Sequence, residues 1–220
     1  MLLYTVKEGK FYNLENFKKD LSDLGENGFP NKIYVNVTNR CSCSCTFCLR
    51  NTKEMDENNS LRLKEDPTPE ELIAEFEKYD WGNVAEVVFC GFGEPTMNLR
   101  ITEVMEYCKK KHNNVPVRIN TNGLGNLVHK KDIPPMFKGL VDTVSISLNA
   151  SNAEEYYRIT RNQFGLESYE AMLKFAKECE QYVPNVVVSI VDCIGEEEIK
   201  ACRKVCEDWG LHLRIRPFEK

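Results

Sequence analysis

Long apolar runs, an excess of basic charge and histidine clusters are what this sequence lacks. Its 220 residues contain no apolar stretch near the roughly 20 residues that cross a bilayer. The formal net charge of −5 argues against the broad basic surface typical of nucleic-acid-binding proteins. The apolar N-terminus is interrupted at Lys7 and Glu8, too early for a secretory signal. We therefore expect a cytoplasmic protein that acts on a small molecule, without membrane or direct nucleic-acid binding.

Histidine is scarce, and cysteine is abundant. His112, His129 and His212 are scattered, so we interpret them as surface or packing residues rather than ligands. Of the ten cysteines, four lie within the eight residues 41–48, directly after a strand-like apolar run at 32–38. Disulfide frameworks belong to small secreted domains, whereas this clustering without a signal peptide favours reduced thiols that bind a metal. Four further cysteines lie in amphipathic patterns typical of core packing: Cys108, Cys179, Cys202 and Cys206.

Two metal sites fit the cysteine cluster. One is a structural zinc ion with four ligands, and the other is a 4Fe-4S cluster with three ligands and one open iron. Cys43 and Cys45 are separated by a single residue, an unusual spacing for zinc, and no second Cys-x-x-Cys pair follows. Cys41, Cys45 and Cys48 instead form Cys-x-x-x-Cys-x-x-Cys, with the aromatic Phe47 before the last cysteine. The spacing therefore favours the iron-sulfur site.

This pattern resembles the signature of the radical S-adenosylmethionine (SAM) superfamily. The resemblance implies that Cys41, Cys45 and Cys48 hold a 4Fe-4S cluster, and that the amino and carboxylate groups of SAM occupy its fourth iron. It leaves Cys43 as a bystander and places Phe47 among the cofactor contacts. It also implies an external electron donor such as a flavodoxin or ferredoxin.

A second motif follows a later strand-like run, at residues 90–95, which read Cys-Gly-Phe-Gly-Glu-Pro. It resembles the Gly-Gly-Glu-Pro motif of the same superfamily, with Phe92 in place of the first glycine. By that resemblance Gly93 and Glu94 contact the SAM amino group. Glycine allows close approach of the backbone to a ligand, and a carboxylate accepts hydrogen bonds from an ammonium group.

Polar residues also end the next two predicted strands. The resemblance assigns Asn122, Ser147 and Asn149 to SAM or to a substrate beside it. Turn capping by asparagine and serine remains the alternative for each of them.

The last two predicted strands supply weaker candidates. Residues 191–195 resemble the apolar adenine-contacting segment of the superfamily, which makes Ile194 a cofactor contact and leaves Asp192 for the substrate. Arg214 and Arg216 share one strand face and are candidates for a carboxylate or substrate clamp, with surface solvation as the alternative. No residue is assigned as the catalytic acid or base.

Strand and helix patterns alternate along the chain, which predicts an α/β fold with parallel strands. After a hairpin at 2–14 and a helical turn or two at 16–24, the predicted strands lie at 32–38, 84–90, 115–120, 141–148, 185–191 and 211–216. Predicted helices begin at Pro69, with Thr68 and Glu71 as a capping box, at Ser151 with Glu154, and span 99–112, 130–138, 166–182 and 196–209. Residues 51–66 read as a loop, which is either a cover for the site or a solvated insertion.

This alternation, with the resemblance, predicts a partial (β/α)6 radical SAM barrel. We expect an N-terminal hairpin and connecting segment at 1–31 and the partial-barrel domain at 32–220. Prolines at 134 and 135 weaken the helix predicted at 130–138.

A narrower resemblance covers nearly the whole chain. The blocks 33–40, 49–51 and 192–198 resemble the TatD-linked radical SAM proteins. That resemblance implies a carbon-nitrogen lyase that cleaves queuine, a 7-deazaguanine base. A glycyl-radical activating enzyme and a non-enzymatic iron-sulfur electron carrier remain alternatives. An electron carrier has no need of the 90–95 motif. An activating enzyme and a lyase use the same SAM site, so they are distinguished by whether candidate bases stimulate the formation of 5'-deoxyadenosine.

Overall fold

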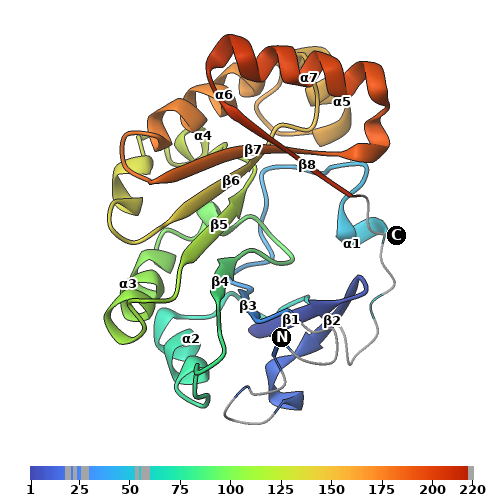
Figure 1. Ribbon diagram of the computed structural model, residues 1–220. Coiled ribbons are helices and arrows are strands. Elements are labelled where there is room, and N and C mark those ends of the chain that lie inside the picture. Colours follow the sequence, from blue (N-terminus) through green and yellow to red (C-terminus); the bar gives the residue numbers. More distant parts are fainter. Residues whose placement is uncertain (18–20, 22–23, 26–29, 53–54, 56–59, 218–220) are drawn as a thin grey trace. The chain divides into compact units, whose positions relative to one another are not determined.

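The computed structural model describes residues 1–17, 21, 24–25, 30–52, 55 and 60–217 (Figure 1). Its backbone contacts form two compact units. The first comprises Met1–Arg40 and Lys53–Ile119, and the second comprises Cys41–Thr52 and Asn120–Lys220. The domain limits expected from the sequence, 1–31 and 32–220, stay a prediction. Within the described residues, no helix is long and apolar enough to cross a membrane.

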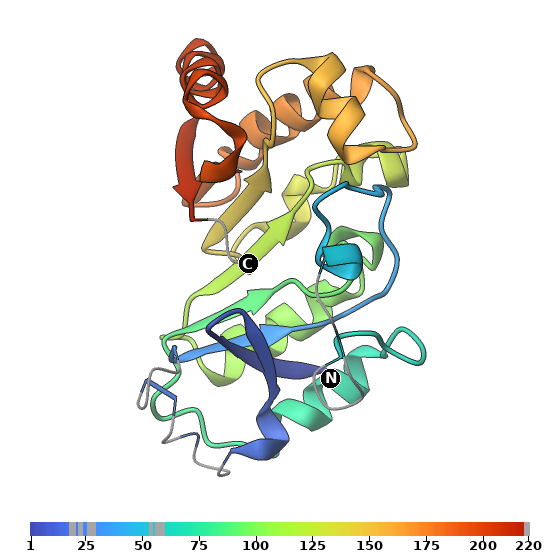
Figure 2. The same cartoon turned by 90° about the vertical axis from the view of Figure 1, so that its right-hand side faces the viewer.

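The first unit carries a hairpin on the edge of parallel strands. Strands β1 (Leu3–Lys7) and β2 (Lys10–Asn13) pair antiparallel, and β1 also pairs antiparallel with β3 (Lys32–Val35) (Figure 2). Glu8 and Gly9 both have positive φ, 50° and 71°, which is the backbone that a tight hairpin turn requires. Parallel pairing follows from β3 to β4 (Glu86–Phe89) and from β4 to β5 (Val117–Thr121). The predicted hairpin is therefore confirmed.

Helices connect these parallel strands. Helix α2 (Pro69–Phe76) begins as predicted, because the Thr68 hydroxyl accepts from the Glu71 N–H at 3.2 Å and the Glu71 carboxylate accepts from the Thr68 N–H at 2.8 Å. Helix α3 (Ile101–Lys111) follows the short 3-10 turn η2 (Pro95–Met97). Helix α2 buries Leu72 and Phe76, and helix α3 buries Ile101 and Val104.

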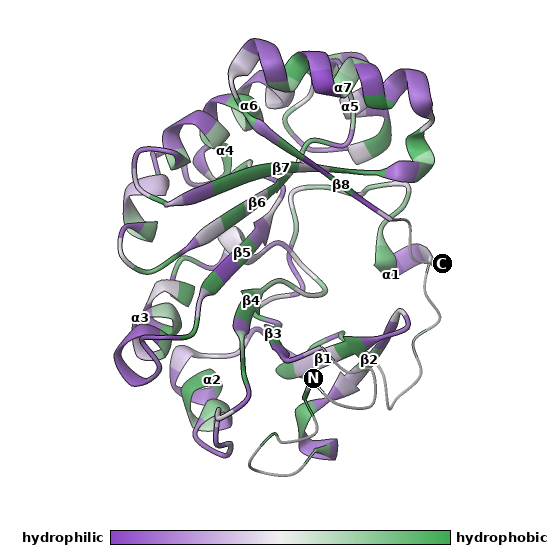
Figure 3. Ribbon diagram, in the orientation of Figure 1, coloured by the Kyte–Doolittle hydropathy of each residue, from purple (hydrophilic) through white to green (hydrophobic). Residues whose placement is uncertain are grey.

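The second unit has its own parallel strands. Strand β7 (Asn185–Val191) pairs with both β6 (Thr143–Ser147) and β8 (His212–Arg216). The remaining elements are α1 (Leu49–Thr52), α4 (Gly125–His129), η3 (Pro134–Phe137), α5 (Ala153–Thr160), α6 (Glu167–Cys179), η4 (Asp192–Ile194) and α7 (Glu196–Trp209). Hydrophobic residues dominate β7, whereas hydrophilic and hydrophobic stretches alternate along α7 (Figure 3). The predicted α/β class with parallel strands and intervening helices is confirmed.

Two helix predictions need correction. The chain forms α4 earlier than the helix predicted at 130–138, ends it at Lys130 with a φ of 51°, and then makes only the 3-10 turn η3 at the prolines. The cap of α5 is Asn152, whose side chain accepts from the Glu155 N–H at 2.9 Å. Ser151 does not cap α5, because its N–H and hydroxyl both donate to Glu198 of α7.

Parts of two predicted segments lie outside the described residues. The helical turns expected at 16–24 fall mostly there; the described 3-10 turn η1 (Leu14–Asn16) ends where they were to begin. Of the loop predicted at 51–66, Asn51 and Thr52 instead belong to helix α1, and residues 53–54 and 56–59 are not described. Its described end is anchored, because Leu61 is fully buried and the Asp66 carboxylate accepts hydrogen bonds from the Thr38 hydroxyl and the Asn39 N–H.

Candidate functional site

The cysteine segment is held in place by its backbone. It begins the second unit and leads directly into α1 (Figure 2). The Ser44 N–H donates to the Thr160 carbonyl and the Thr46 N–H donates to the Ile159 carbonyl, each at 2.9 Å. These carbonyls lie at the end of α5, where a helix leaves acceptors without partners of its own. The segment 41–48 thus uses the end of α5 as a fixed support.

The four thiols of this segment differ in environment. Cys41, Cys45 and Cys48 are partly exposed, whereas Cys43 is buried, with 4% of its surface accessible. Hydrogen bonds with Cys41 and Cys45, together with burial, raise the pKa of the Cys43 thiol. The same bond from Cys43 lowers the pKa of Cys45. Cys43 thus differs from the three cysteines of the motif in its burial, and its role as a bystander stays a prediction.

Three N–H groups point at the sulfurs. Arg50 Nε donates to Cys48 Sγ at 3.2 Å, and the backbone N–H of Cys43 donates to Cys41 Sγ at 3.4 Å. Asn122 Nδ2 lies 3.1 Å from Ser42 Oγ and 3.5 Å from Cys43 Sγ. The structure thus brings Asn122, predicted as a SAM contact, to the thiols.

This donor set fits an iron-sulfur cluster. Three partly exposed thiols, with N–H donors at the Cys41 and Cys48 sulfurs and one cation nearby, form an environment in which cluster thiolates are stabilised. Among the described residues, no three His, Cys, Asp or Glu side chains are already arranged around a single point. Cluster binding therefore requires the three ligand thiols to converge.

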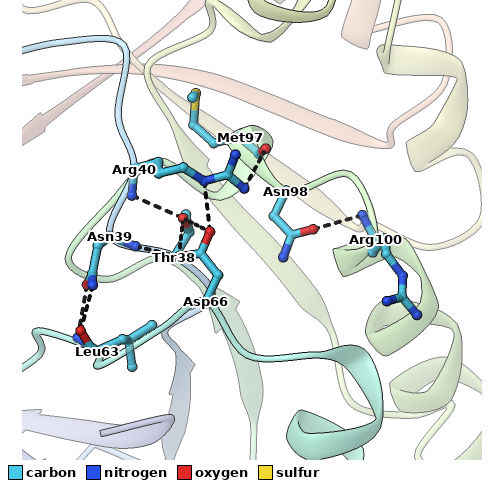
Figure 4. Close-up of polar contacts among 8 residues, drawn as sticks. All are labelled: Thr38, Asn39, Arg40, Leu63, Asp66, Met97, Asn98 and Arg100. Atoms are coloured by element: carbon cyan, nitrogen blue, oxygen red, sulfur yellow. Dashed lines mark hydrogen bonds and ion pairs between the residues drawn. The ribbon is translucent and has the colours of Figure 1, made fainter.

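Asp66 fixes the three residues that precede Cys41 (Figure 4). Its two carboxylate oxygens each accept from Thr38 Oγ1 at 2.8 Å, and they also accept from the Asn39 N–H at 3.1 Å and from Arg40 Nε at 2.8 Å. Burial alone raises the pKa of the Asp66 carboxyl, but these hydrogen bonds outweigh it and hold the pKa below its usual value. Sequence reasoning missed Asp66, since nothing in its local pattern marks it.

We expect Asp66→Asn to destabilise the protein by about 1–2 kcal/mol at pH 7, because an amide offers one acceptor oxygen and no charge. A carboxyl whose folded pKa is depressed contributes stability above its unfolded pKa of about 4 and loses it as pH falls through the lower folded value. The unfolding free energy of Asp66→Asn should therefore fall less between pH 5 and pH 3 than that of the wild type. Urea unfolding across this range measures the difference.

Glu106→Gln is the matched control, because Glu106 makes only an exposed pair with Lys110 on α3. It should change stability by less than about 0.5 kcal/mol. An Asp66→Asn variant with the same pH slope as the wild type would contradict the assigned role.

The 90–95 motif packs on the same three residues within the first unit. A Cβ at Gly93 would lie 2.4 Å from the carbonyl oxygens of both Thr38 and Arg40, and backbone atoms cannot yield. The Glu94 N–H donates to the Arg40 carbonyl at 2.8 Å. Glycine is thus required at position 93. Phe92 departs from the family motif, and its N–H donates to the Asn36 side chain at 3.1 Å.

Glu94 is buried, with 5% of its surface accessible, and caps η2. Its Oε1 accepts from the Thr96 N–H at 3.1 Å and from the Thr96 hydroxyl at 2.7 Å. These bonds orient the carboxylate. A buried carboxylate with a fixed orientation is suited to bind an ammonium group.

The remaining predicted residues lie in the second unit. Asn149 is nearly buried and has a φ of 63°, a left-handed backbone that asparagine tolerates better than most residues. Ser147 ends β6 and is partly exposed. Asp192 and Ile194 form η4 directly after β7, and Asp192 is exposed. Phe47 is exposed beside the last cysteine of the motif.

Arg214 and Arg216 lie on β8, with Cα partners Ser189 and Val191 on β7. Arg214 is exposed and Arg216 is partly buried. Sequence reasoning missed Arg50, although its position two residues after Cys48 was a signal that it could reach that sulfur. It also missed Asn36, whose Nδ2 donates to the carbonyls of Met1 and Leu61.

Comparison with known proteins identifies the family. The family model described as the Radical SAM superfamily matches residues 35–207. A probable GTP 3',8-cyclase from Thermococcus kodakarensis is 27% identical over 158 residues, which cover 72% of this chain and 46% of the relative. The GTP 3',8-cyclase from Aquifex aeolicus is 24% identical over 184 residues, covering 83% and 55%. The chain thus spans about half the length of these curated relatives.

Solved structures support the fold. Methylornithine synthase superposes with a TM-score of 0.55 at 15% identity, covering 85% of this chain and 53% of the other. A radical SAM methyltransferase from Sphaerobacter thermophilus has a TM-score of 0.55 at 16% identity, covering 99% and 67%. Likeness at this level of identity shows the fold alone. From the family match, the chain belongs to the radical SAM superfamily, whose enzymes use a 4Fe-4S cluster and SAM.

Proposed function

We propose that this protein is a queuine lyase, a radical SAM enzyme that breaks a carbon-nitrogen bond of queuine and releases 7-aminomethyl-7-deazaguanine in queuosine salvage. When bound, the cluster and SAM supply a 5'-deoxyadenosyl radical that abstracts a hydrogen atom from the substrate. The protein positions the reactants and excludes water. An external electron donor of the flavodoxin or ferredoxin class completes the system.

The cysteine segment carries the radical SAM part of this proposal. Cys41, Cys45 and Cys48 are its partly exposed thiols, and the end of α5 holds their backbone. We assign the cluster to these three, because they carry the Cys-x-x-x-Cys-x-x-Cys spacing of the family and are more exposed than Cys43. Gly93 and Glu94 receive the SAM amino group, with Glu94 already oriented by Thr96.

The resemblance to TatD-linked radical SAM proteins supports the choice of queuine. Names of the relatives add a related observation, since GTP and queuine both present a guanine-type pyrimidine edge. That edge carries N–H groups, which can donate hydrogen bonds to a carboxylate or amide oxygen. Asp192 is our first candidate for this contact and Asn149 the second.

Arg214 and Arg216 are candidates for acceptor groups on the substrate. Asn122, Ser147 and Ile194 are proposed for SAM, as is Phe47. Cyclisation of GTP is the second candidate function, favoured by the names of the relatives alone.

We expect reduced, reconstituted protein to form 5'-deoxyadenosine from SAM in amounts that depend on queuine. The same reaction should yield 7-aminomethyl-7-deazaguanine, detected by mass spectrometry. A parallel reaction with GTP should give no substrate-dependent 5'-deoxyadenosine, and omission of the reductant serves as the control for both.

Each outcome decides between the candidates. Turnover with GTP but not queuine would replace the lyase by a cyclase. Formation of 5'-deoxyadenosine only in the presence of a partner protein would identify a glycyl-radical activating enzyme. A bound cluster without any SAM cleavage would favour the alternative that the protein is a non-enzymatic electron carrier.

A further inference from the structure

Arg50 contacts both halves of the cysteine segment. It lies in α1, and its Nε donates to Cys48 Sγ at 3.2 Å while its Nη2 donates to the Cys43 carbonyl at 3.1 Å. The guanidinium group is planar, so two bonds made from one fork fix its orientation as well as its position. A positive charge is therefore held against one of the proposed cluster ligands.

Arg50 is the charged donor among those described at these sulfurs. The remaining donors described at these sulfurs, the Asn122 amide and the Cys43 N–H, are neutral. Arg50 thus places its charge at the Cys48 sulfur.

We propose that Arg50 raises the reduction potential of the cluster by donating a charged hydrogen bond to the Cys48 sulfur. Reduction adds one negative charge to the cluster, so a fixed cation and an N–H donor at a ligand sulfur stabilise the reduced form more than the oxidised form. Arg50 is then a positioning residue that acts through the Cys48 sulfur and favours the one-electron reduction with which the reaction starts. This inference rests on the proposed cluster ligands.

Two substitutions separate the charge of Arg50 from its hydrogen bonds. Arg50→Gln keeps an N–H donor and removes the charge, whereas Arg50→Lys keeps the charge and loses the planar fork. Arg158→Gln is the matched control, because Arg158 lies on α5 of the same unit and pairs with the exposed Glu155. Each protein is reconstituted anaerobically as the full chain, and its iron and sulfide are measured first.

The decisive measurement is a redox titration of the cluster followed by electron paramagnetic resonance. At a fixed potential, we expect Arg50→Gln to show at least a tenfold lower ratio of reduced to oxidised cluster than the wild type. For a one-electron couple this corresponds to a midpoint about 59 mV lower. The midpoint of Arg50→Lys should lie between those of the wild type and Arg50→Gln, and the midpoint of Arg158→Gln should match that of the wild type.

A fully loaded Arg50→Gln variant with the wild-type midpoint would overturn the proposal. So would loss of iron from both Arg50 variants, because Arg50 would then hold the cluster rather than tune it. Wild-type protein that binds no cluster would instead overturn the proposed function, and iron analysis distinguishes this result before any potential is measured.

Discussion

Simultaneous replacement of Cys41, Cys45 and Cys48 by alanine is expected to abolish cluster binding, while Cys43→Ala keeps about four irons and four sulfides per chain. The three thiols are partly exposed and stand on a backbone anchored to α5. Removing all three leaves a single cysteine in the segment, which cannot hold a cluster. The expected loss is therefore complete rather than partial.

Cys43→Ala is the sharper half of this experiment. Cys43 lies among the three proposed ligands, and its backbone N–H donates to Cys41 Sγ at 3.4 Å, so this variant tests whether its thiol also binds iron. Its burial in a compact loop predicts a stability cost of roughly 1 kcal/mol from the small cavity. Iron and sulfide analysis after anaerobic reconstitution gives the answer, and thermal unfolding reports the packing cost separately.

Cys202→Ala is the matched control, because Cys202 is a buried cysteine on α7 outside the segment. It should retain the full cluster. Complete loss of iron in Cys43→Ala, with Cys202→Ala intact, would show that Cys43 is a ligand. Retention of iron in the triple variant would remove the ligand assignment.

Elements with strong local signals were predictable from the sequence. The capping box at Thr68 and Glu71 places the start of α2. The β-branched run at 185–191 predicts both the first and the last residue of strand β7. Gly210 ends α7 with a φ of 60°. In each case the determinant is a backbone preference within a few residues, which sequence alone expresses.

Contacts between distant segments were not predictable. Asp66 accepts a hydrogen bond from Thr38, which lies 28 positions earlier in the sequence. Asn36 donates one to the carbonyl of Leu61, which lies 25 positions later. Neither residue is marked by its neighbours in sequence. Ser151 shows the same limit, since its hydrogen bonds to Glu198 replace the cap that local pattern predicts. The cysteine motif was recognisable because ligand spacing is a local property, whereas the residues that brace it are set by tertiary structure.

Glu94→Gln is expected to weaken SAM binding about 10- to 100-fold with no loss of iron. A hydrogen bond to a charged group contributes about 1.5–3 kcal/mol, which corresponds to this range of affinity. Glutamine keeps the size of the side chain and an oxygen that can accept from the Thr96 N–H and hydroxyl. The cap of η2 is thus retained, while the negative charge that we propose for the SAM ammonium group is removed.

Calorimetric titration of SAM into the reconstituted protein measures this effect, with iron content determined on the same sample. Glu103→Gln provides the control, since Glu103 is an exposed residue of α3 that pairs with Arg100. Glu94→Ala removes both the charge and the cap, so it should lose stability as well as affinity. If Glu94→Gln binds SAM as the wild type does while Glu94→Ala unfolds more easily, Glu94 acts only as the cap of η2. A selective loss of affinity in Glu94→Gln requires that the carboxylate charge itself contacts the cofactor, because the packing and the cap are the same in both proteins.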